Sequence, residues 1–105
     1  HYPTLNDATL REARDVGLNE VASLIDNGID GPLPGTQLGR CSPKVIKLVK
    51  QSDLIIAKGG GNFDSLEEEL RTLKTPITFM LLTKCQPIIK YFNSKMYQPV
   101  LANFN

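Results

Sequence analysis

The chain has 105 residues, which is enough for one small domain or for part of a larger one. Hydrophobic residues make up 41% of it and charged residues 22%, as in ordinary globular proteins. The formal net charge is +1 and the lysines are spread along the chain, so nothing favours a nucleic-acid or anionic-membrane partner, which would need a concentrated basic face. No apolar run approaches the roughly 20 residues needed to cross a bilayer.

The start of the chain and its cysteines bear on its context. It begins His1-Tyr2-Pro3, with no initiator Met and no signal-peptide pattern, so either the start was trimmed or the chain belongs to something longer. We assign no role to the isolated His1. Cys41 and Cys85 lie far apart and outside any CxxC spacing, which does not support a zinc or redox motif. A disulfide stays open as an alternative, but two buried reduced thiols fit better and predict a cytoplasmic protein.

The N-terminal part contains one predicted helix and one predicted strand. Thr9-Leu10-Arg11-Glu12 is a capping-box pattern, and it predicts a short helix from Leu10 to Val16 that ends at Gly17. Val21 to Ile25 is an apolar, strand-like run, closed by the turn-rich Asp26-Asn27-Gly28.

A loop and a second helix follow. Gly31-Pro32-Leu33-Pro34-Gly35 must be a loop, because proline removes hydrogen-bond donors and glycine supplies unusual dihedral angles. Ser42-Pro43 is typical of an N-cap followed by proline at the first helical position. The helix behind it has an apolar face and an opposite stripe of lysines, which we interpret as a solvated surface: Lys44, Lys47 and Lys50.

The C-terminal half alternates apolar runs with helical segments. Leu54 to Ala57 and Ile77 to Leu82 read as buried strands, covered on both faces as in a parallel sheet. Between them, Asp64 and Ser65 are candidate caps of a helix that carries Glu67, Glu68 and Glu69 in its first turns. A further helix is predicted from Pro87 through Phe92, and a last short strand at Val100-Leu101. This alternation predicts a Rossmann-like, three-layer α/β domain with a mostly parallel sheet.

Three polar segments are expected at one edge of this sheet. Ligands of such sheets bind beyond the carboxyl ends of the strands. Asn6-Asp7-Ala8-Thr9, Lys58 to Phe63 and Thr83-Lys84-Cys85 should converge there.

The glycine run carries the clearest signal. Gly59, Gly60 and Gly61 follow a buried strand and precede a helix, so the backbone can approach an anion closely, and Lys58 can place its ammonium on a phosphate oxygen. The alternative is a flexible turn with a surface lysine. The run is not a P-loop, because GxxxxGK[ST] is absent, and the absence of GxGxxG makes a dinucleotide-binding fold a weak hypothesis.

Lys84 and Asp7 complete the candidate site. Lys84 ends the second apolar strand, in the position equivalent to Lys58, and two lysines at one sheet edge would repel unless an anion lay between them. Asp7 can bind a hard divalent cation, which prefers oxygen ligands. Alternatively, Asn6-Asp7 is a turn or capping pair, since no DxD or HxxxH partner lies nearby.

The ordered motifs resemble a known family. Leu5 to Thr9, Asp53 to Phe63 and Leu81 to Cys85 are similar, in order and spacing, to successive motifs of the DUF89 family of damage-control phosphatases. The Lys-Gly-x-x-Asn-aromatic form and the Lys-Cys ending resemble the stand-alone microbial branch most closely. The resemblance implies that residues 1–105 are the C-terminal part of a DUF89-like α/β phosphatase domain, with the remainder of that domain upstream.

The resemblance also implies an activity. Members of the family are metal-dependent hydrolases that use Mn²⁺, Co²⁺, Ni²⁺ or Mg²⁺ and act on small phosphorylated metabolites such as sugar phosphates. By motif, Asp7 would be a metal ligand and catalytic, and Lys84 a second phosphate contact. Lys58 would be catalytic and would hold the substrate phosphate together with the rest of its motif: Gly59, Gly60, Gly61 and Asn62.

The chain departs from the family at several points, including its missing helical N-terminal portion and Gly60, where relatives often have a larger polar residue. The family uses an upstream Asp-Asn pair as further metal ligands, and nothing here matches it, so the isolated chain is expected to be inactive. Leu82 stands where relatives often have a basic residue, which bears on substrate preference. Two rival hypotheses are a non-catalytic phosphate- or nucleotide-binding α/β module and an interaction domain whose sheet only carries a surface.

Overall fold

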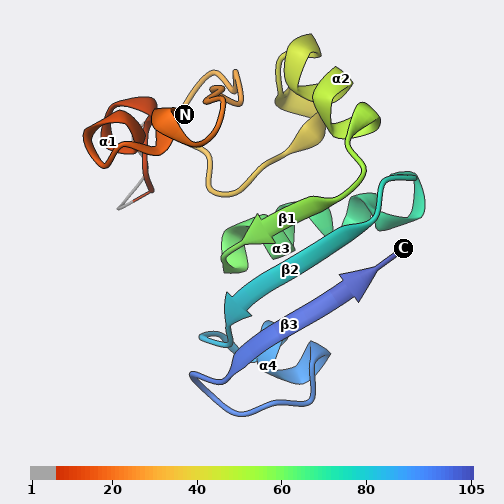
Figure 1. Ribbon diagram of the computed structural model, residues 1–105. Helices are drawn as coiled ribbons and strands as arrows, with labels where there is room; N and C mark the ends of the chain where they lie inside the picture. The colour runs from red at the N-terminus through yellow and green to blue at the C-terminus, as the bar shows by residue number, and fades with distance from the viewer. Residues whose placement is uncertain (1–6) are drawn as a thin grey trace.

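The computed structural model describes residues 7–105, and Figure 1 shows a small twisted sheet with helices beside it and an N-terminal arm. Leu5 and Asn6 of the first motif, and His1, lie outside the described residues. The elements in chain order are α1 (Leu10–Asp15), η1 (Leu18–Glu20), η2 (Leu38–Arg40), α2 (Pro43–Gln51), β1 (Ile55–Lys58), α3 (Gly60–Leu66), η3 (Glu68–Arg71), β2 (Ile77–Leu82), α4 (Gln86–Tyr91) and β3 (Pro99–Phe104).

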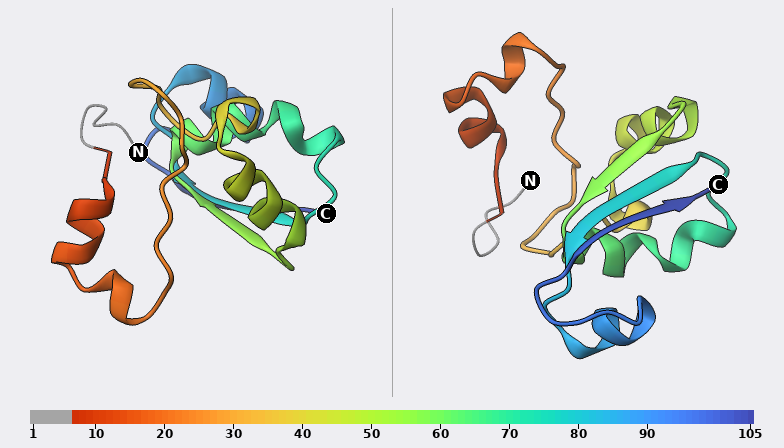
Figure 2. Two further views of the ribbon diagram at one scale, coloured as in Figure 1. Left: turned by 90° about the horizontal axis from the view of Figure 1, so that it is seen from above. Right: turned by 60° about the horizontal axis from the view of Figure 1, so that its bottom comes forward.

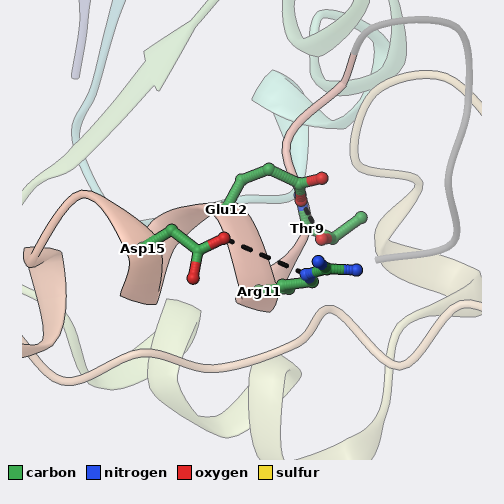
Figure 3. Close-up of polar contacts among 4 residues, drawn as sticks. All are labelled: Thr9, Arg11, Glu12 and Asp15. Atoms are coloured by element: carbon green, nitrogen blue, oxygen red, sulfur yellow. Dashed lines mark hydrogen bonds and ion pairs between the residues drawn. The ribbon is translucent and has the colours of Figure 1, made fainter.

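The predicted capping box starts α1 (Figure 3). The Thr9 N–H donates to the Glu12 carboxylate at 2.8 Å, and the Thr9 hydroxyl donates to the same group. These hydrogen bonds lower the pKa of Glu12, because they favour its ionised form. The helix ends one residue earlier than predicted, and Gly17 follows it with a left-handed φ of 79°. The remaining contact in Figure 3, Arg11 to Asp15 at 3.9 Å, is solvent-exposed and adds little.

The strand predicted at Val21 to Ile25 does not form, and this prediction is wrong. Val21 ends η1 and is 82% exposed, and the chain then runs as an irregular connection to η2. Figures 1 and 2 show this orange-to-yellow connection crossing open space between α1 and the sheet. A strand needs a neighbour for its backbone hydrogen bonds, and none lies alongside this segment within residues 7–105.

The second predicted helix, α2, forms as expected. Ser42 is its N-cap, with the side-chain oxygen accepting from the Val45 N–H at 3.4 Å, and Pro43 is its first residue. Val45 is buried, whereas the three lysines of the opposite stripe are exposed. The amphipathic prediction for this segment is confirmed except at Leu48, which belongs to the predicted apolar face and is 46% exposed.

The strands form a mixed sheet in the order β1-β2-β3. β1 and β2 are parallel, with Ile55 opposite Ile77, and this pair is joined through α3 and η3 as the α/β prediction requires. β3 runs antiparallel to β2, with Phe104 opposite Ile77, and is longer than the two residues predicted. The α/β fold class is confirmed. The antiparallel strand β3 pairs with the edge of β2 that does not pair with β1.

The core lies on one face of the sheet, where α3 and α4 pack (Figure 2). It consists of alternate strand residues and the inward residues of the two helices: Ala57, Phe63, Leu66, Ile77, Phe79, Leu81 and Ile88. On the other face Ile56 is 64% and Leu101 69% exposed. The prediction that the strands are covered on both faces is therefore wrong for the described residues, which supply two layers of the α/β architecture.

The helix after β1 starts earlier than the sequence predicts. Asp64 and Ser65 do not cap it; they lie inside α3, which begins at Gly60 with Gly59 as N-cap. The glutamates that follow lie at the C-terminal end of α3 and in η3. The physical reason is that Phe63 and Leu66, three residues apart, both bury on the sheet, and this requires helix around them. α4 begins at Gln86, one residue before the predicted start, with Cys85 as its N-cap.

The two thiols differ in environment. Both are free, as expected, but only Cys41 is partly buried, and burial raises its pKa. Cys85 is exposed, so the prediction of two buried thiols is wrong at that position. None of the helices in residues 7–105 combines the length and apolar character that crossing a membrane would require.

The one-sided core predicts unequal costs for neighbouring residues of β2. Phe79 is 0% exposed, so Phe79→Ala should lower the free energy of unfolding by about 4 kcal/mol through lost burial and a cavity. Met80, 45% exposed on the opposite face, is the control, and Met80→Ala should cost about 1 kcal/mol. Urea unfolding measures both. Equal losses would show that the open face is covered as well.

Candidate functional site

A pocket of about 740 Å³ opens where β1 and β2 end and β3 begins. Part of its lining is the glycine turn, which we define as Lys58 to Gly61. The other lining residues come from the start of α3, the end of β2, the start of α4 and the start of β3: Asp64, Met80, Leu81, Leu82, Lys84, Cys85, Ile88, Pro99, Val100 and Leu101. Two of the three predicted segments meet in this pocket.

Two lysines line the pocket from neighbouring strands. Lys58 is the last residue of β1 and pairs in register with Met80, and Lys84 follows the end of the adjacent strand β2. Asp64 is the one carboxylate among the lining residues of the described chain. Within residues 7–105 no ion pair joins either lysine to a carboxylate. The pocket therefore has net positive charge and free ammonium groups, which suit an anionic ligand.

The glycine turn depends on a conformation that side chains disfavour. Gly59 has φ 99° and ψ 154°, and its N–H still donates to the Met80 carbonyl at 2.9 Å, so it extends the ladder between β1 and β2 before the chain turns into α3. A Cβ on Gly60 would lie 3.3 Å from Cδ1 of Ile88. Without side chains, the backbone turns sharply and stays open toward the pocket.

The loop that contains Gly35 and Thr36 packs against the glycine turn, and we call this set of contacts the brace. Gly35 has φ 71°, and a Cβ added there would lie 2.1 Å from the Gly61 carbonyl oxygen, so the two backbones are in direct contact. The Thr36 N–H donates to Oγ of Ser65 at 2.9 Å, and that hydroxyl lies 2.9 Å from the Gly61 carbonyl oxygen, to which it can donate. The predicted loop at residues 31–35 thus supports the glycine turn, which the sequence alone did not reveal.

Asn62 belongs to this brace and not to the pocket lining. Its Nδ2 donates to the Lys58 carbonyl at 2.7 Å, and its Oδ1 accepts from the Thr36 hydroxyl at 2.8 Å. The side chain lines a separate pocket of about 110 Å³ beside β1. The sequence-based expectation placed Asn62 on the substrate phosphate, whereas the structure uses its amide to hold the turn.

Asp7 is the second predicted site residue, after Asn62, that is absent from the pocket lining. It is exposed just before α1, a helix that buries no residue, and it is absent from the lining. Figures 1 and 2 show α1 standing apart from the sheet. No group of three His, Cys, Asp or Glu side chains that could hold a metal ion occurs within residues 7–105. The donor set of the described chain therefore does not by itself fit a metal centre.

Several lining residues escaped sequence reasoning. Asp64 follows the glycine motif directly, and a carboxylate so close in sequence to Lys58 indicates a candidate pocket residue. The sequence predicts Asp64 as a helix cap, and this interpretation left it out of the site. The pocket lining also includes the apolar side chains of Met80, Leu82 and Leu101. The sequence predicts strands that are buried on both faces, so it gives no reason to expect these side chains to be accessible. Only the one-sided sheet exposes them.

Together, the parallel strand pair and the pocket at its carboxyl end define an α/β domain with a positively charged pocket at a strand-end turn. Comparison with protein families agrees with this class. The model of the damage-control phosphatase ARMT1-like domain matches residues 1–100, and the chain belongs to this family.

Individual relatives share the same region. An uncharacterized protein of Methanocaldococcus jannaschii is 42% identical over 86 residues, which is 82% of this chain and 28% of that protein. A damage-control phosphatase of Archaeoglobus fulgidus is 34% identical over 89 residues, 84% of this chain and 29% of that protein. The crystal structure of a DUF89 family protein from Pyrococcus horikoshii superposes with a TM-score of 0.83 at 28% identity, covering 98% of this chain and 34% of that one. The chain thus spans about a third or less of the proteins it matches.

The brace predicts that Gly35 tolerates no side chain. Gly35→Ala should lower the free energy of unfolding by about 2 kcal/mol, because the added Cβ meets the Gly61 carbonyl and the φ is left-handed. Gly39→Ala is the control, since a Cβ at Gly39 meets nothing within 4 Å. Urea unfolding of both variants is the measurement, and equal stability of the two would contradict the contact.

Proposed function

We propose that this chain carries the phosphate-binding half of a metal-dependent phosphatase that hydrolyses phosphomonoesters of small metabolites, such as sugar phosphates. The observation that carries the proposal is that Lys58, Lys84 and the glycine turn line one pocket, in a chain of the damage-control phosphatase family. Two relatives named damage-control phosphatase, one from Archaeoglobus fulgidus and one from Pyrococcus horikoshii, support the same reaction class.

The pocket residues suit charge that develops on phosphoryl oxygens. Lys58 and Lys84 approach the phosphoryl group from two strands and offset negative charge as the bond to the leaving oxygen breaks. Gly59 to Gly61 let the backbone come close to the same group, because no side chain intervenes. Asp64, the one carboxylate of the described lining, offsets part of the positive charge of the two lysines.

The metal requirement is part of the proposal. A divalent cation, when bound, would polarise the phosphoryl group and help to activate a nucleophile. Asp7 is proposed as one ligand. The other ligands would have to come from outside residues 7–105, because the described residues contain no sufficient cluster. The chain in isolation would then bind phosphate without hydrolysing it.

A second candidate is a non-catalytic phosphate-binding module. It is favoured by one observation, the lack of a metal-holding cluster among the residues that the structure describes. Both candidates use the same pocket, so phosphate binding does not distinguish them, whereas turnover in the full-length protein does.

The two pocket lysines should each be needed for activity. In the full-length protein, Lys58→Met and Lys84→Met should lower kcat/KM for p-nitrophenyl phosphate about 100-fold, because each removes charge stabilisation from the phosphoryl oxygens. Lys90→Met is the control, since Lys90 is exposed on α4 outside the pocket lining.

Cys85 supplies a binding readout for the same variants. Inorganic phosphate should slow iodoacetamide modification of Cys85, which lines the pocket, but not of Cys41, which is partly buried elsewhere. Lys58→Met should abolish the protection. Equal protection of both thiols, or none in the wild type, would remove the pocket assignment.

Metal dependence has its own test. Chelation of the full-length protein with EDTA should abolish turnover, and Mn²⁺ should restore it. Asp7→Asn should lower kcat at least about 100-fold through loss of a ligand, with unfolding unchanged. Asp15→Asn on the nearby α1 is the control and should keep full activity. An active Asp7→Asn protein would rule Asp7 out as a ligand.

A further inference from the structure

Thr83 lies between the end of β2 and the pocket residue Lys84, and it is 0% exposed. Its hydroxyl donates to the Lys95 carbonyl and accepts from the Gln98 N–H at 3.0 Å. Its own N–H donates to the Gln98 carbonyl at 3.0 Å, and its carbonyl accepts from the Tyr97 N–H at 2.5 Å. All of the polar groups of this one buried residue therefore bind the segment 95–98.

The segment that Thr83 holds is the loop from Asn93 to Gln98, which joins α4 to β3. Asn93 and Tyr97 have φ of 48° and 58°, a left-handed conformation that residues other than glycine rarely adopt. Lys95 N–H donates to the Gln98 side chain at 3.0 Å, an internal contact on the exposed side. Such a loop keeps its shape only when surrounding contacts over-determine it.

Both ends of this arrangement reach the pocket. Lys84 follows Thr83 directly, and Pro99 to Leu101, which follow the loop, form part of the pocket wall. A shift of the loop would therefore move the wall and the backbone that carries the lysine together. The lysine's contribution depends on its position, because displacement of a group by about 1 Å can cost as much as 100-fold in rate.

We propose that Thr83 is a positioning residue, which clamps the loop from Asn93 to Gln98 against the end of β2 and so fixes where Lys84 and the β3 wall stand in the pocket. The inference rests on the proposed phosphate function of that pocket. Thr83 contacts no ligand itself; it acts through Lys84.

Three threonine variants of the full-length protein separate positioning from general stability. Thr83→Val removes the hydroxyl at nearly constant volume, and Thr83→Ser restores it. Thr75→Val is the matched control: Thr75 is also buried, at 7% exposure, and its hydroxyl donates to the Val49 carbonyl at 2.9 Å, at the opposite end of β2. Gln98→Ala loosens the same loop from its exposed side and serves if Thr83→Val does not fold.

The readouts are the inhibition constant of inorganic phosphate, KM and kcat for p-nitrophenyl phosphate, and the unfolding midpoint in urea. Thr83→Val should raise the phosphate inhibition constant about tenfold and lower kcat, and Thr83→Ser should recover at least half of the loss on a logarithmic scale. Gln98→Ala should change both values in the same direction. Thr75→Val should lose a comparable part of the unfolding midpoint and keep the wild-type inhibition constant.

Two results would overturn the inference. The first is a folded Thr83→Val or Gln98→Ala protein with the wild-type inhibition constant; the second is an equal change in Thr75→Val, which would reveal a purely structural effect. Failure of the proposed function looks different, because Lys84→Met would then leave phosphate inhibition unchanged or the wild type would not be inhibited at all. That outcome removes the role of Thr83 together with the site.

Discussion

The edge-to-face contact between Phe63 and Phe79 is the interaction on which the rest of the structure depends. Their ring centroids are 5.0 Å apart at an interplanar angle of 80°, and Phe63 makes further ring contacts with Tyr91 and Phe92 of the α4 region. This cluster holds α3 and α4 on the same face of the sheet. Since α3 begins inside the glycine run, its docking also determines where the glycine turn lies.

Residues outside the pocket lining hold the pocket residues in place on two sides. Behind the turn, the Gly35–Gly61 backbone contact and the Asn62 amide keep Lys58 and its neighbours in place. Beside β2, buried Thr83 anchors the loop that leads to β3. The lysines themselves stay free of ion pairs within the described chain. The backbone on which the two lysines stand is thus held by hydrogen bonds, whereas their side chains are exposed.

The face of the sheet opposite this core leaves large apolar side chains in solvent, among them Ile56 and Leu101. The chain spans 34% of the related Pyrococcus horikoshii structure and superposes on it with a TM-score of 0.83, so this part of the domain has the same arrangement in a much longer protein. α1 likewise buries no residue, and this helix, together with Asp7 just before it, lies apart from the pocket.

The amino-acid sequence by itself determined the local elements and the chemistry of the strand ends. Capping residues and hydrophobic periodicity predicted α1 and α2. Lys58, the glycines and Lys84 were recognisable as candidate site residues because the carboxyl ends of the strands of an α/β sheet lie at its ligand-binding edge. Only the tertiary structure decided which faces of the sheet are covered and that the Asn62 side chain supports the glycine turn. It also showed that the apolar run from Val21 has no strand to pair with among residues 7–105. These three features depend on contacts with residues that are distant along the chain. A local sequence pattern does not specify such contacts, because they form only when the chain packs.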